Sequence, residues 1–313
     1  MSKLDFLTII LLPASLVILC SFFIQLYIKF IQNSKLIDKP SKRSNHKRPI
    51  LKGAGLIVIP MIIFSTTLVF FLNNIITEEW IIFFLITLIL TLVSFFDDVY
   101  NISSLLRLVV HSVCVLISIY FLTLDYQPSF VFLEKILHIG INQTLLEFLF
   151  IFFGAMFWIW IINLFNFMDG MDGITATQMC FFMFGVNILT FTEIESHELQ
   201  ILSLYIFIGF CGFFLHNKPP AKVFLGDSGS IPAGYLVGLT LFKSALTFQV
   251  FFPLLILCMY FLLDSTVTLI LRLAKKENIL QAHTSHFYQR MLRSGYSHSF
   301  VLKKIVIIHF ILL

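Results

Sequence analysis

Apolar residues gather in ten long stretches separated by short polar segments. The stretches lie near residues 6–32, 53–72, 80–96, 105–124, 145–163, 174–191, 199–215, 231–247, 250–271 and 300–313. A helix that crosses a bilayer needs about 20 apolar residues, and all but the short last stretch come close to that length. The pattern therefore predicts an all-α, polytopic membrane protein with about ten transmembrane helices.

The composition excludes an ordinary soluble protein. Of the 313 residues, 58% are hydrophobic and 12% are charged, and the mean hydropathy is +0.95. Soluble domains carry roughly 25% charged residues, and a soluble fold of this length could not bury so much apolar surface. We expect one integral membrane domain over residues 1–313, in contact with the lipid bilayer. The net charge of +4 is modest and gives no reason to expect a nucleic-acid partner.

The five cysteines each lie inside an apolar stretch, and no two are close in the sequence: Cys20, Cys114, Cys180, Cys211 and Cys258. That spacing predicts neither a disulfide framework nor a zinc site. We expect these residues to behave as small buried apolar side chains. The first apolar stretch is too long for a signal-peptide core and lacks an A-x-A motif, so we expect it to remain as a membrane anchor.

Basic residues are unevenly distributed between the two sides of the predicted membrane. One side holds the Lys- and Arg-rich segment 33–52 together with 97–104, 164–173, 216–230 and 272–299. The other side holds 73–79, 125–144, 192–198 and 248–249, and its charged residues include Glu78, Glu79, Glu193, Glu195 and Glu198. The positive-inside rule places the first set in the cytoplasm and both termini outside.

The carboxylate and histidine motifs all lie in or beside these cytoplasmic segments. Several loops thus contribute polar clusters to one membrane face, which is how an active site would be assembled. A transporter would more often place its polar groups in the middle of the spans, and here the apolar stretches are nearly free of them. We therefore expect a cytoplasmic-face active site.

Asp97 and Asp98 end the third apolar stretch, in the sequence SFFDDVYN. A single charge at the bilayer centre costs on the order of 2.5–3.5 kcal/mol, so two adjacent carboxylates must reach water or a cation. The pair is either a polar helix stop or a functional pair that binds a metal or transfers protons, because neighbouring carboxylates share a cation or differ in pKa.

The segment NLFNFMDGMDGI, residues 163–174, is more specific. Asn163, Asn166, Asp169 and Asp172 recur at every third position, so on a helical turn they share one face. The glycine after each aspartate would break the helix and let a ligand approach the backbone. The pattern predicts a binding loop, and its glycines do not follow the spacing of an EF-hand.

The segment KPPAKVFLGDSGSIPAG, residues 218–234, places Asp227 in a Gly-Ser turn just before an apolar stretch. Backbone N–H groups and hydroxyls at a helix start favour phosphate. A carboxylate beside them suits Mg²⁺ carried with a diphosphate, because Mg²⁺ binds one or two carboxylates and phosphate oxygens. A capped turn that enters a helix is the alternative. Gly234 and Gly238 are more typical of close helix packing.

The last cytoplasmic segment contains AHTSHFYQRMLRSGYSH, residues 282–298. His283 and His286 have the H-x-x-H spacing of some metal sites, but no third ligand follows at a diagnostic distance. Phosphate binding together with Arg290 and Arg293 fits the other loops better. A solvated loop is the alternative.

Asp264 lies inside an apolar stretch and is a candidate functional residue for that reason. A structural pair with Arg272 or with a neighbouring helix is equally consistent with the sequence. The isolated histidines are interpreted as structural or solvated residues: His111, His138, His197 and His309.

Together these motifs resemble the polyprenyl-phosphate N-acetylhexosamine-1-phosphate transferase superfamily (glycosyltransferase family 4), which includes the phospho-N-acetylmuramoyl-pentapeptide translocases. The resemblance covers nearly the whole chain, because DKPSKRSNHKRPILKGAG (38–55), FFDD, NFMDGMDG and FLGDSGS occur in the family's order. HTSHFYQR is similar to the O-antigen-initiating branch that handles UDP-N-acetyl-fucosamine or UDP-N-acetyl-quinovosamine. The chain departs from the commoner pattern at Lys52 and Ala54, where that branch often has Arg and Gly.

The resemblance implies a role for each matching residue. Asp227 matches the family's Mg²⁺ ligand, with Mn²⁺ as an alternative ion, and Asp97 with Asp98 matches the catalytic aspartate pair, of which Asp98 would also bind the metal. The pocket for the uridine nucleotide and its phosphates matches Asn166, Asp169, Gly170 and Asp172, with Asn166 also among the catalytic candidates. Lys52 and Arg290 would bind substrate, and His283 or His286 matches the region of the catalytic histidine.

The implied reaction moves an N-acetylhexosamine 1-phosphate from a UDP-N-acetylhexosamine to undecaprenyl phosphate and releases UMP. It would take place at the bacterial cytoplasmic (inner) membrane, at the start of O-antigen or a related envelope glycan. Because the acceptor phosphate is already anionic near pH 7, the main task is to neutralise and position two anions. Asp97 is the candidate if a base is used.

Two alternatives belong to other classes of protein. A membrane phosphotransferase of the CDP-alcohol type would carry a D-G-x-x-A-R signature, which MDGMDGITAT lacks. A transporter is the second alternative, and the nearly clean apolar stretches disfavour it. The sequence leaves the sugar unspecified and a homodimer open.

Overall fold

The computed structural model describes residues 7–31, 35–40, 46, 48–125, 143–192, 196–247, 250–278 and 283–313. After a π-helical turn, η1 (Leu7–Leu11), the structure consists almost entirely of α-helices. These are α2 (Leu12–Phe30), α3 (Gly55–Leu72), α4 (Glu78–Tyr100), α5 (Ser104–Asp125), α7 (Gln143–Met168), α8 (Ile174–Thr192), α9 (His197–Asn217), α10 (Asp227–Thr247), α11 (Phe251–Leu257), α12 (Met259–Ala274), α13 (Phe287–Arg293) and α14 (His298–Leu312). Two-residue strands β1 (Ile37–Asp38) and β2 (Ile50–Leu51) pair antiparallel between α2 and α3. The predicted all-α class is confirmed.

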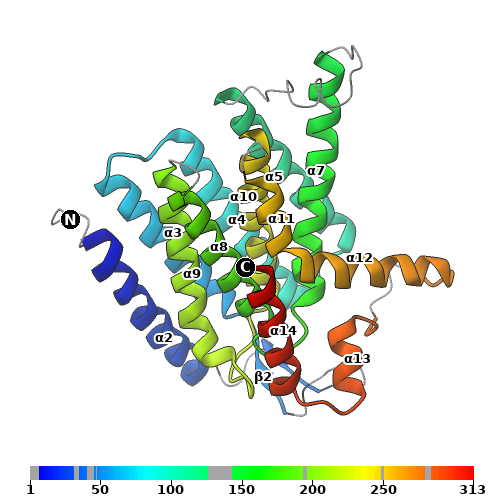
Figure 1. Ribbon diagram of the computed structural model, residues 1–313. Coiled ribbons are helices and arrows are strands. Elements are labelled where there is room, and N and C mark those ends of the chain that lie inside the picture. The colour runs from blue at the N-terminus through cyan, green and yellow to red at the C-terminus, as the bar shows by residue number, and fades with distance from the viewer. Residues whose placement is uncertain are drawn as a thin grey trace.

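The long helices lie side by side, and α10 is the central one (Figure 1). It packs most extensively against α7 and α4, and every residue from 231 to 246 is buried. Close approach depends on its glycines, because a Cβ at Gly234 would lie 2.8 Å from the Cα of Ile162, and one at Gly238 would collide with the ring of Trp158. The structure thus confirms the predicted packing role of both glycines.

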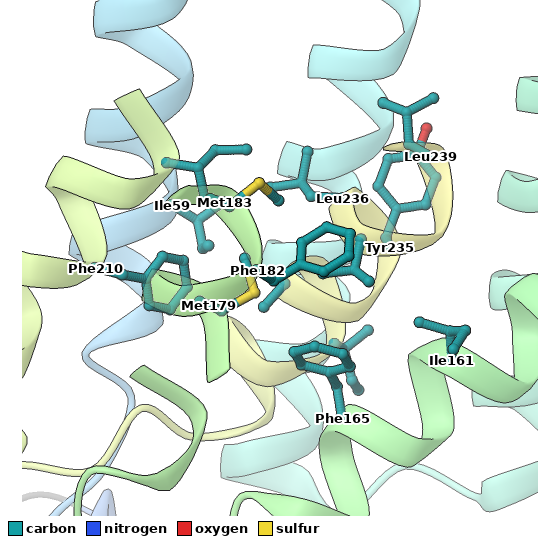
Figure 2. Close-up of a cluster of buried hydrophobic side chains, with 14 of the residues drawn as sticks. Ile59, Ile161, Phe165, Met179, Phe182, Met183, Phe210, Tyr235, Leu236 and Leu239 are labelled. Atoms are coloured by element: carbon teal, nitrogen blue, oxygen red, sulfur yellow. The ribbon is translucent and has the colours of Figure 1, made fainter. Parts of the chain in front are cut away.

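Large apolar side chains fill the space between the central helices. Figure 2 shows ten labelled members of this core from α3, α7, α8, α9 and α10: Ile59, Ile161, Phe165, Met179, Phe182, Met183, Phe210, Tyr235, Leu236 and Leu239. Many apolar side chains on the outer helices are instead exposed, such as Phe64, Phe153 and Leu105. Apolar residues on both the inside and the outside are what a bundle surrounded by lipid requires.

Among the residues that the structure describes, seven helices are long and apolar enough to cross a membrane, and an eighth span is obtained if α11 and α12 count as one bent span. The protein is therefore a multi-pass membrane protein. The described part of each of the ten predicted stretches is mostly helical, but the count of ten membrane-length helices is not confirmed. Two of the predicted stretches form helices outside that set: α10, which begins with the polar sequence DSGS and contains Lys243, and α14, which has 15 residues.

The predicted span 250–271 is not one straight helix. It breaks at Cys258, and α11 and α12 are bent by 69°. In Figure 1, α12 runs across the long axis of the bundle and projects from its side. At the break, the carbonyl of Leu257 accepts a hydrogen bond of 2.9 Å from Nε2 of Gln178, a fully buried side chain on α8. A backbone carbonyl that loses its helical hydrogen bond inside a membrane protein needs another donor. The side chain of Gln178, from a distant part of the sequence, provides that donor here.

Two cysteines that are distant in the sequence lie together in the fold. The sulfur atoms of Cys180 on α8 and Cys211 on α9 are 3.6 Å apart, and all five cysteines carry free thiols. Both side chains are half-buried rather than buried. Their proximity follows from the packing of α8 on α9, which sequence spacing could not predict.

Candidate active site

A polar cavity of about 310 Å³ lies where α4 and α7 end and α10 begins, and we call this region the polar end of the bundle. Seven of the predicted site residues line it: Lys52, Asp98, Asn166, Asp169, Gly170, Asp172 and Asp227. They come from four segments that are far apart in the sequence. The structure therefore brings together most of the residues that the motifs singled out.

Short backbone pairings bring Lys52 to the cavity. Strand β2 pairs with the segment between α9 and α10, where the N–H of Phe224 donates to the carbonyl of Leu51 at 2.8 Å. The N–H of Ala54 donates in turn to the carbonyl of Phe224 at 3.1 Å. Between these two bonds, the ammonium of Lys52 lies 3.1 Å from Oδ1 of Asp98. The two loops are thus held in register, and Lys52 forms an ion pair with Asp98 on α4.

Three carboxylates and two cations form the centre of the site. Arg107 on α5 places Nη1 2.7 Å from Oδ2 of Asp97 and 3.3 Å from Oδ2 of Asp227, so one nitrogen bridges the two carboxylates. The other oxygen of Asp97 accepts the N–H of Ile102 at 2.6 Å. Asp97 and Asp98 are only 7% and 3% exposed, and burial of this much negative charge requires the nearby cations.

Arg107 is a site residue that the motif analysis did not single out. It lies near the start of the apolar stretch 105–124 and belongs to none of the motifs. A cation inside a membrane span is a functional candidate by default, as was argued for Asp264. The same rule applied to Arg107 would have indicated its role.

Asp227 is the first residue of α10, and the backbone at the start of this helix also binds Asp98 on α4. Gly226 has φ +76°, a left-handed conformation that favours glycine, and it turns the chain so that the N–H of Ser228 donates to Oδ2 of Asp98 at 3.2 Å. The helix start that was predicted to attract phosphate therefore already binds a carboxylate. Within the part of the chain that the structure describes, the buried hydroxyls of Ser228 and Ser230 have no hydrogen-bond partner.

The residues present fit a divalent cation bound together with a phosphate ligand. Among the described residues, no group of three or more His, Cys, Asp or Glu side chains is arranged to hold a metal ion by itself. Mg²⁺ needs only one or two protein carboxylates when phosphate oxygens and water complete its coordination. Asp227 and Asp98 provide them, beside the two unpaired serine hydroxyls. Burial, together with the charges of Asp98 and Asp97, raises the pKa of Asp227 to about 7, so a cation would relieve an unfavourable accumulation of charge.

The predicted binding loop begins on α7 and continues beyond it. Asn166 lies in the last turn of the helix, which ends at Met168, and Asp169 and Asp172 follow. These three side chains share the cavity. Asn163 does not, because its Nδ2 donates to the carbonyl of Ile159 on its own helix at 2.8 Å. The expectation of one common face therefore fails at Asn163.

Asp169 lies in surroundings that favour its neutral form. Burial raises its pKa to about 8, and the charges of Asp227 and Asp98 act in the same direction. The hydroxyl of Thr175 opposes this shift by donating to Oδ1 at 2.6 Å. The carboxyl group of Asp169 is therefore mostly protonated at pH 7.

Asp172 lines the cavity and joins three segments of the chain. Its Oδ2 accepts the N–H of Ala221 at 3.0 Å, and its Oδ1 lies 3.2 Å from Nδ1 of His298. The neighbouring N–H of Gly173 donates to Asn217 at the end of α9. Asn217 and His298 both line the cavity, and neither was among the predicted site residues. His298 was the last residue of the histidine-rich segment, and only its contact with Asp172 distinguishes it.

The predicted histidines do not line the cavity. His286 is buried, with Nδ1 3.0 Å from Oδ1 of Asp264, and Asp264 also accepts the N–H of Phe287 at 3.0 Å. Of the alternatives for Asp264, the structure shows a pair with His286 rather than Arg272, which contacts Glu277. The H-x-x-H segment thus anchors the start of α13 to α12.

Through this anchor, α13 contributes Gln289 to the cavity, whereas Arg290 is exposed and is not among the lining residues. Tyr288 packs so closely on Gly170 that a Cβ there would collide with its hydroxyl, which explains why glycine is needed at this position. His283 donates to or accepts from Ser285 at 2.9 Å. Burial, together with His286 and Arg272, lowers the pKa of His283 to about 4, so it is neutral at pH 7.

Comparison with known proteins points to one family. The sequence profile of glycosyl transferase family 4 matches residues 80–245. A probable undecaprenyl-phosphate N-acetylglucosaminyl 1-phosphate transferase of Bacillus subtilis is 27% identical over 283 residues, which are 88% of this chain and 75% of that protein. An undecaprenyl-phosphate alpha-N-acetylglucosaminyl 1-phosphate transferase of Thermotoga maritima is 26% identical over 84% of this chain and 76% of its own length. A phospho-N-acetylmuramoyl-pentapeptide-transferase of Streptococcus pneumoniae is 36% identical over 28% of this chain and 27% of its own length.

Proposed function

Because the chain belongs to glycosyl transferase family 4, we propose that it transfers an N-acetylhexosamine 1-phosphate from a UDP-sugar to undecaprenyl phosphate. The observation that carries this proposal is the polar cavity lined by Lys52, Asp98, Asp227 and the Asp-Gly-x-Asp-Gly loop. Lys52 pairs with Asp98 there, and Arg107 joins Asp227 to Asp97 beside the cavity. Such a site can bind a diphosphate with a divalent cation. The relatives from Bacillus subtilis and Thermotoga maritima, which align with most of this chain, act on undecaprenyl phosphate according to their names. Their names support the same acceptor here.

In the proposed reaction, an oxygen of the acceptor phosphate attacks the β-phosphorus of the UDP-sugar. A new P–O bond forms, the bond from the β-phosphorus to the bridging oxygen breaks, and UMP leaves with that oxygen. Asp98 and Asp227 would hold Mg²⁺, with Mn²⁺ as an alternative, and the cation when bound would neutralise negative charge on the diphosphate.

Lys52 and Arg107 then have a second use. In the structure they pair with the carboxylates, and once a cation neutralises Asp98 and Asp227 they can turn to phosphate oxygens. Asp97 is not placed as a general base, because Arg107 and the N–H of Ile102 engage its two oxygens. Its role is to hold Arg107, and the anionic acceptor phosphate needs no base near pH 7.

The lipid acceptor needs an apolar surface that begins near the polar cavity. A second cavity of about 420 Å³ lies between α7 and α10 and is lined by Leu149, Phe153, Trp158, Leu241, Phe242 and other apolar residues. Leu241 follows Asp227 on the same helix by 14 residues, or about 21 Å along the helix axis. An undecaprenyl chain can span that distance, so its phosphate would lie at Asp227 and part of its tail in this cavity.

The pKa of Asp169 leads to a prediction about pH. Above about pH 8 the carboxyl group should ionise and add negative charge beside Asp98 and Asp227, where the diphosphate must bind. The KM for the UDP-sugar should therefore rise as pH increases through 8. Asp169→Asn, which keeps the shape but cannot ionise, should flatten this rise. KM should be measured against pH for the wild type and for Asp169→Asn. An equal rise of KM above pH 8 in both proteins would show that Asp169 does not control this rise.

The distribution of basic loops leads to a prediction about orientation. We propose that the polar end faces the cytoplasm of a bacterium, because Lys52, Gln289 and His298 line the cavity there and belong to the Lys- and Arg-rich sequence segments 33–52 and 272–299. In a variant whose native cysteines are replaced by alanine, cysteines introduced at Lys39 and Arg293 should react only with a reagent in the cytoplasm. A cysteine at Glu78, which is exposed at the opposite end of α4, should react only from outside. Labelling of all three positions from one side would contradict this orientation.

The donor sugar can be identified with a panel. The HTSHFYQR segment supports UDP-N-acetyl-fucosamine or UDP-N-acetyl-quinovosamine and a place at the start of O-antigen or related glycan synthesis, whereas the named relatives support UDP-N-acetylglucosamine. Membranes that contain the protein should release UMP and form a lipid-linked product with one of these donors when undecaprenyl phosphate is present. Transport of a solute without any UMP release would instead favour a transporter.

A further inference from the structure

His298 lines the polar cavity together with Asp98 and Asp227. It is the first residue of α14, after Ser297, whose hydroxyl accepts the N–H of Phe300 at 3.2 Å and caps the helix. Leu302, one turn further on, packs against Gly173, where an added Cβ would lie 2.8 Å from its Cδ2. The position of the histidine is thus fixed both by a helix cap and by packing against the binding loop.

Asp172 holds the Nδ1 edge of the imidazole. Its carboxylate lies 3.2 Å from Nδ1, and its backbone N–H donates to the same nitrogen at 3.4 Å. The second carboxylate oxygen accepts the N–H of Ala221 at 3.0 Å. A carboxylate that contacts one ring nitrogen of a histidine orients the ring and determines what the other nitrogen can do.

The exposure of the two side chains separates their roles. The side chain of Asp172 is 9% exposed and that of His298 is 20% exposed, and both line the cavity. A ligand in the cavity therefore meets more of the imidazole than of the carboxylate, whose oxygens are already in contact with Ala221 and His298. The sequence motif alone suggested direct nucleotide binding by Asp172, but the geometry makes His298 the more accessible group.

The chemistry of the ring indicates which ligand atoms it would bind. The N–H of Asp172 donates to Nδ1, and in a neutral ring this hydrogen bond places the proton on Nε2. A protonated ring, which would donate from Nδ1 to the carboxylate of Asp172, also carries a proton on Nε2. In these two states Nε2 is a donor and binds an acceptor oxygen, whereas a neutral ring with its proton on Nδ1 would make Nε2 an acceptor. Uridine nucleotides offer such oxygens on the uracil ring and on the phosphates.

We propose that His298 binds an acceptor oxygen of the uridine nucleotide through Nε2, and that Asp172 is a positioning residue that orients the imidazole. This inference rests on the proposed function, because it assumes that the nucleotide of a UDP-sugar occupies the cavity. It assigns to α14, which lies outside the matched family region 80–245, a direct part in binding the donor.

Binding of UMP to the purified full-length protein, measured by calorimetry, tests the proposal without requiring turnover. His298→Ala should raise the Kd for UMP by about tenfold or more, the usual effect of losing one hydrogen bond to a polar or charged ligand group. The KM for the UDP-sugar should rise similarly, and the KM for undecaprenyl phosphate should stay unchanged. His298→Gln, which retains an N–H donor on a side chain of similar length, should restore part of the affinity. A parallel titration with uridine, which lacks the phosphate, shows whether His298 binds a uracil oxygen or a phosphate oxygen. If the contact is to the phosphate, wild type and His298→Ala should bind uridine equally.

The chain contains a closely matched control. His197 is likewise the first residue of its helix, follows the capping residue Ser196, and is exposed at the other end of the bundle. His197→Ala should leave both UMP affinity and turnover unchanged. The thermal midpoint of each variant shows whether it is folded.

A double-mutant cycle tests the role of Asp172. If it acts through His298, then Asp172→Asn should weaken UMP binding in the wild type but have little further effect in His298→Ala. Multiplicative losses would show that Asp172 contacts the nucleotide directly and would overturn its assignment as a positioning residue. An unchanged UMP Kd in folded His298→Ala, or a wild type that does not bind UMP, would overturn the proposal for His298. UMP binding that depends on His298 but occurs without any sugar-phosphate transfer would support the inference and contradict the proposed function.

Discussion

Asp227→Asn is expected to abolish sugar-phosphate transfer while the protein remains folded in the membrane. The asparagine keeps the shape of the side chain but removes one of the two carboxylates that would hold Mg²⁺ at the start of α10. Loss of a group that only orients a metal ligand already lowers affinity or activity by about 10- to 100-fold, so loss of the ligand itself should reduce kcat by more than about 100-fold. Initial rates of UMP release from purified protein in detergent measure this effect.

Two controls accompany this prediction. Glu198→Gln removes a carboxylate from the first turn of α9, far from the polar end, and should leave the rate unchanged. EDTA should stop the wild-type enzyme, and added Mg²⁺ or Mn²⁺ should restore it. Full activity in EDTA, or normal kcat for Asp227→Asn, would show that the carboxylates do not hold a catalytic cation.

Arg107→Ala should also cause a large loss of activity. One nitrogen of Arg107 bridges Asp97 and Asp227, and without it Lys52 is the remaining cation that the structure shows paired with this group of carboxylates. The site would lose the charge that holds Asp227 in place and that stabilises the transferred phosphoryl group. Removal of one such stabilising group typically lowers kcat by about 100- to 1,000-fold.

Arg107→Lys provides the comparison for this variant. Because a single nitrogen makes both contacts, an ammonium can reproduce the bridge if it reaches the same place, and we expect partial activity between that of wild type and Arg107→Ala. Rates for the three proteins should be compared at saturating donor and acceptor, with thermal midpoints measured in the same detergent. Equal kcat for Arg107→Ala and wild type would remove Arg107 from the site.

Much of the fold and of the site follows from local patterns. The apolar stretches predict the helices because a bilayer fixes both the length and the polarity of a span. The Asp-Gly repeats and the Gly-Ser turn predict Asp169, Asp172 and Asp227 because few sequences place carboxylates beside flexible backbone at the end of an apolar helix. For these residues, the chemistry of the site is readable from the sequence.

The remaining features depend on contacts between distant segments. At the break between α11 and α12, the carbonyl of Leu257 accepts a hydrogen bond from Gln178 on α8. No property of residues 250–271 alone indicates that partner. His283 and His286 were predicted site residues because of their spacing, but Asp264 binds His286 away from the cavity. The site histidine that the structure reveals, His298, is distinguished only by Asp172.

The glycines predicted a break in helix α7, but the exact position of the break could not be read from the sequence. A repeat of three residues predicts a shared face only while the helix continues, and α7 ends at Met168, between Asn166 and Asp169. Asn166 and the two aspartates still meet in one cavity because the chain turns around it, whereas Asn163 bonds to its own helix. The motif therefore predicted the ligand-binding groups better than the conformation that presents them.

The most direct test of the account follows the β-phosphate of the donor. Purified protein should be incubated with undecaprenyl phosphate, Mg²⁺ and a UDP-N-acetylhexosamine that carries ³²P in its β-phosphate. Transfer of the sugar 1-phosphate predicts that the label appears in the lipid fraction in a one-to-one ratio with released, unlabelled UMP. Label that stays in water-soluble UDP while sugar enters the lipid, or the absence of any lipid-linked product with every donor tested, would contradict it.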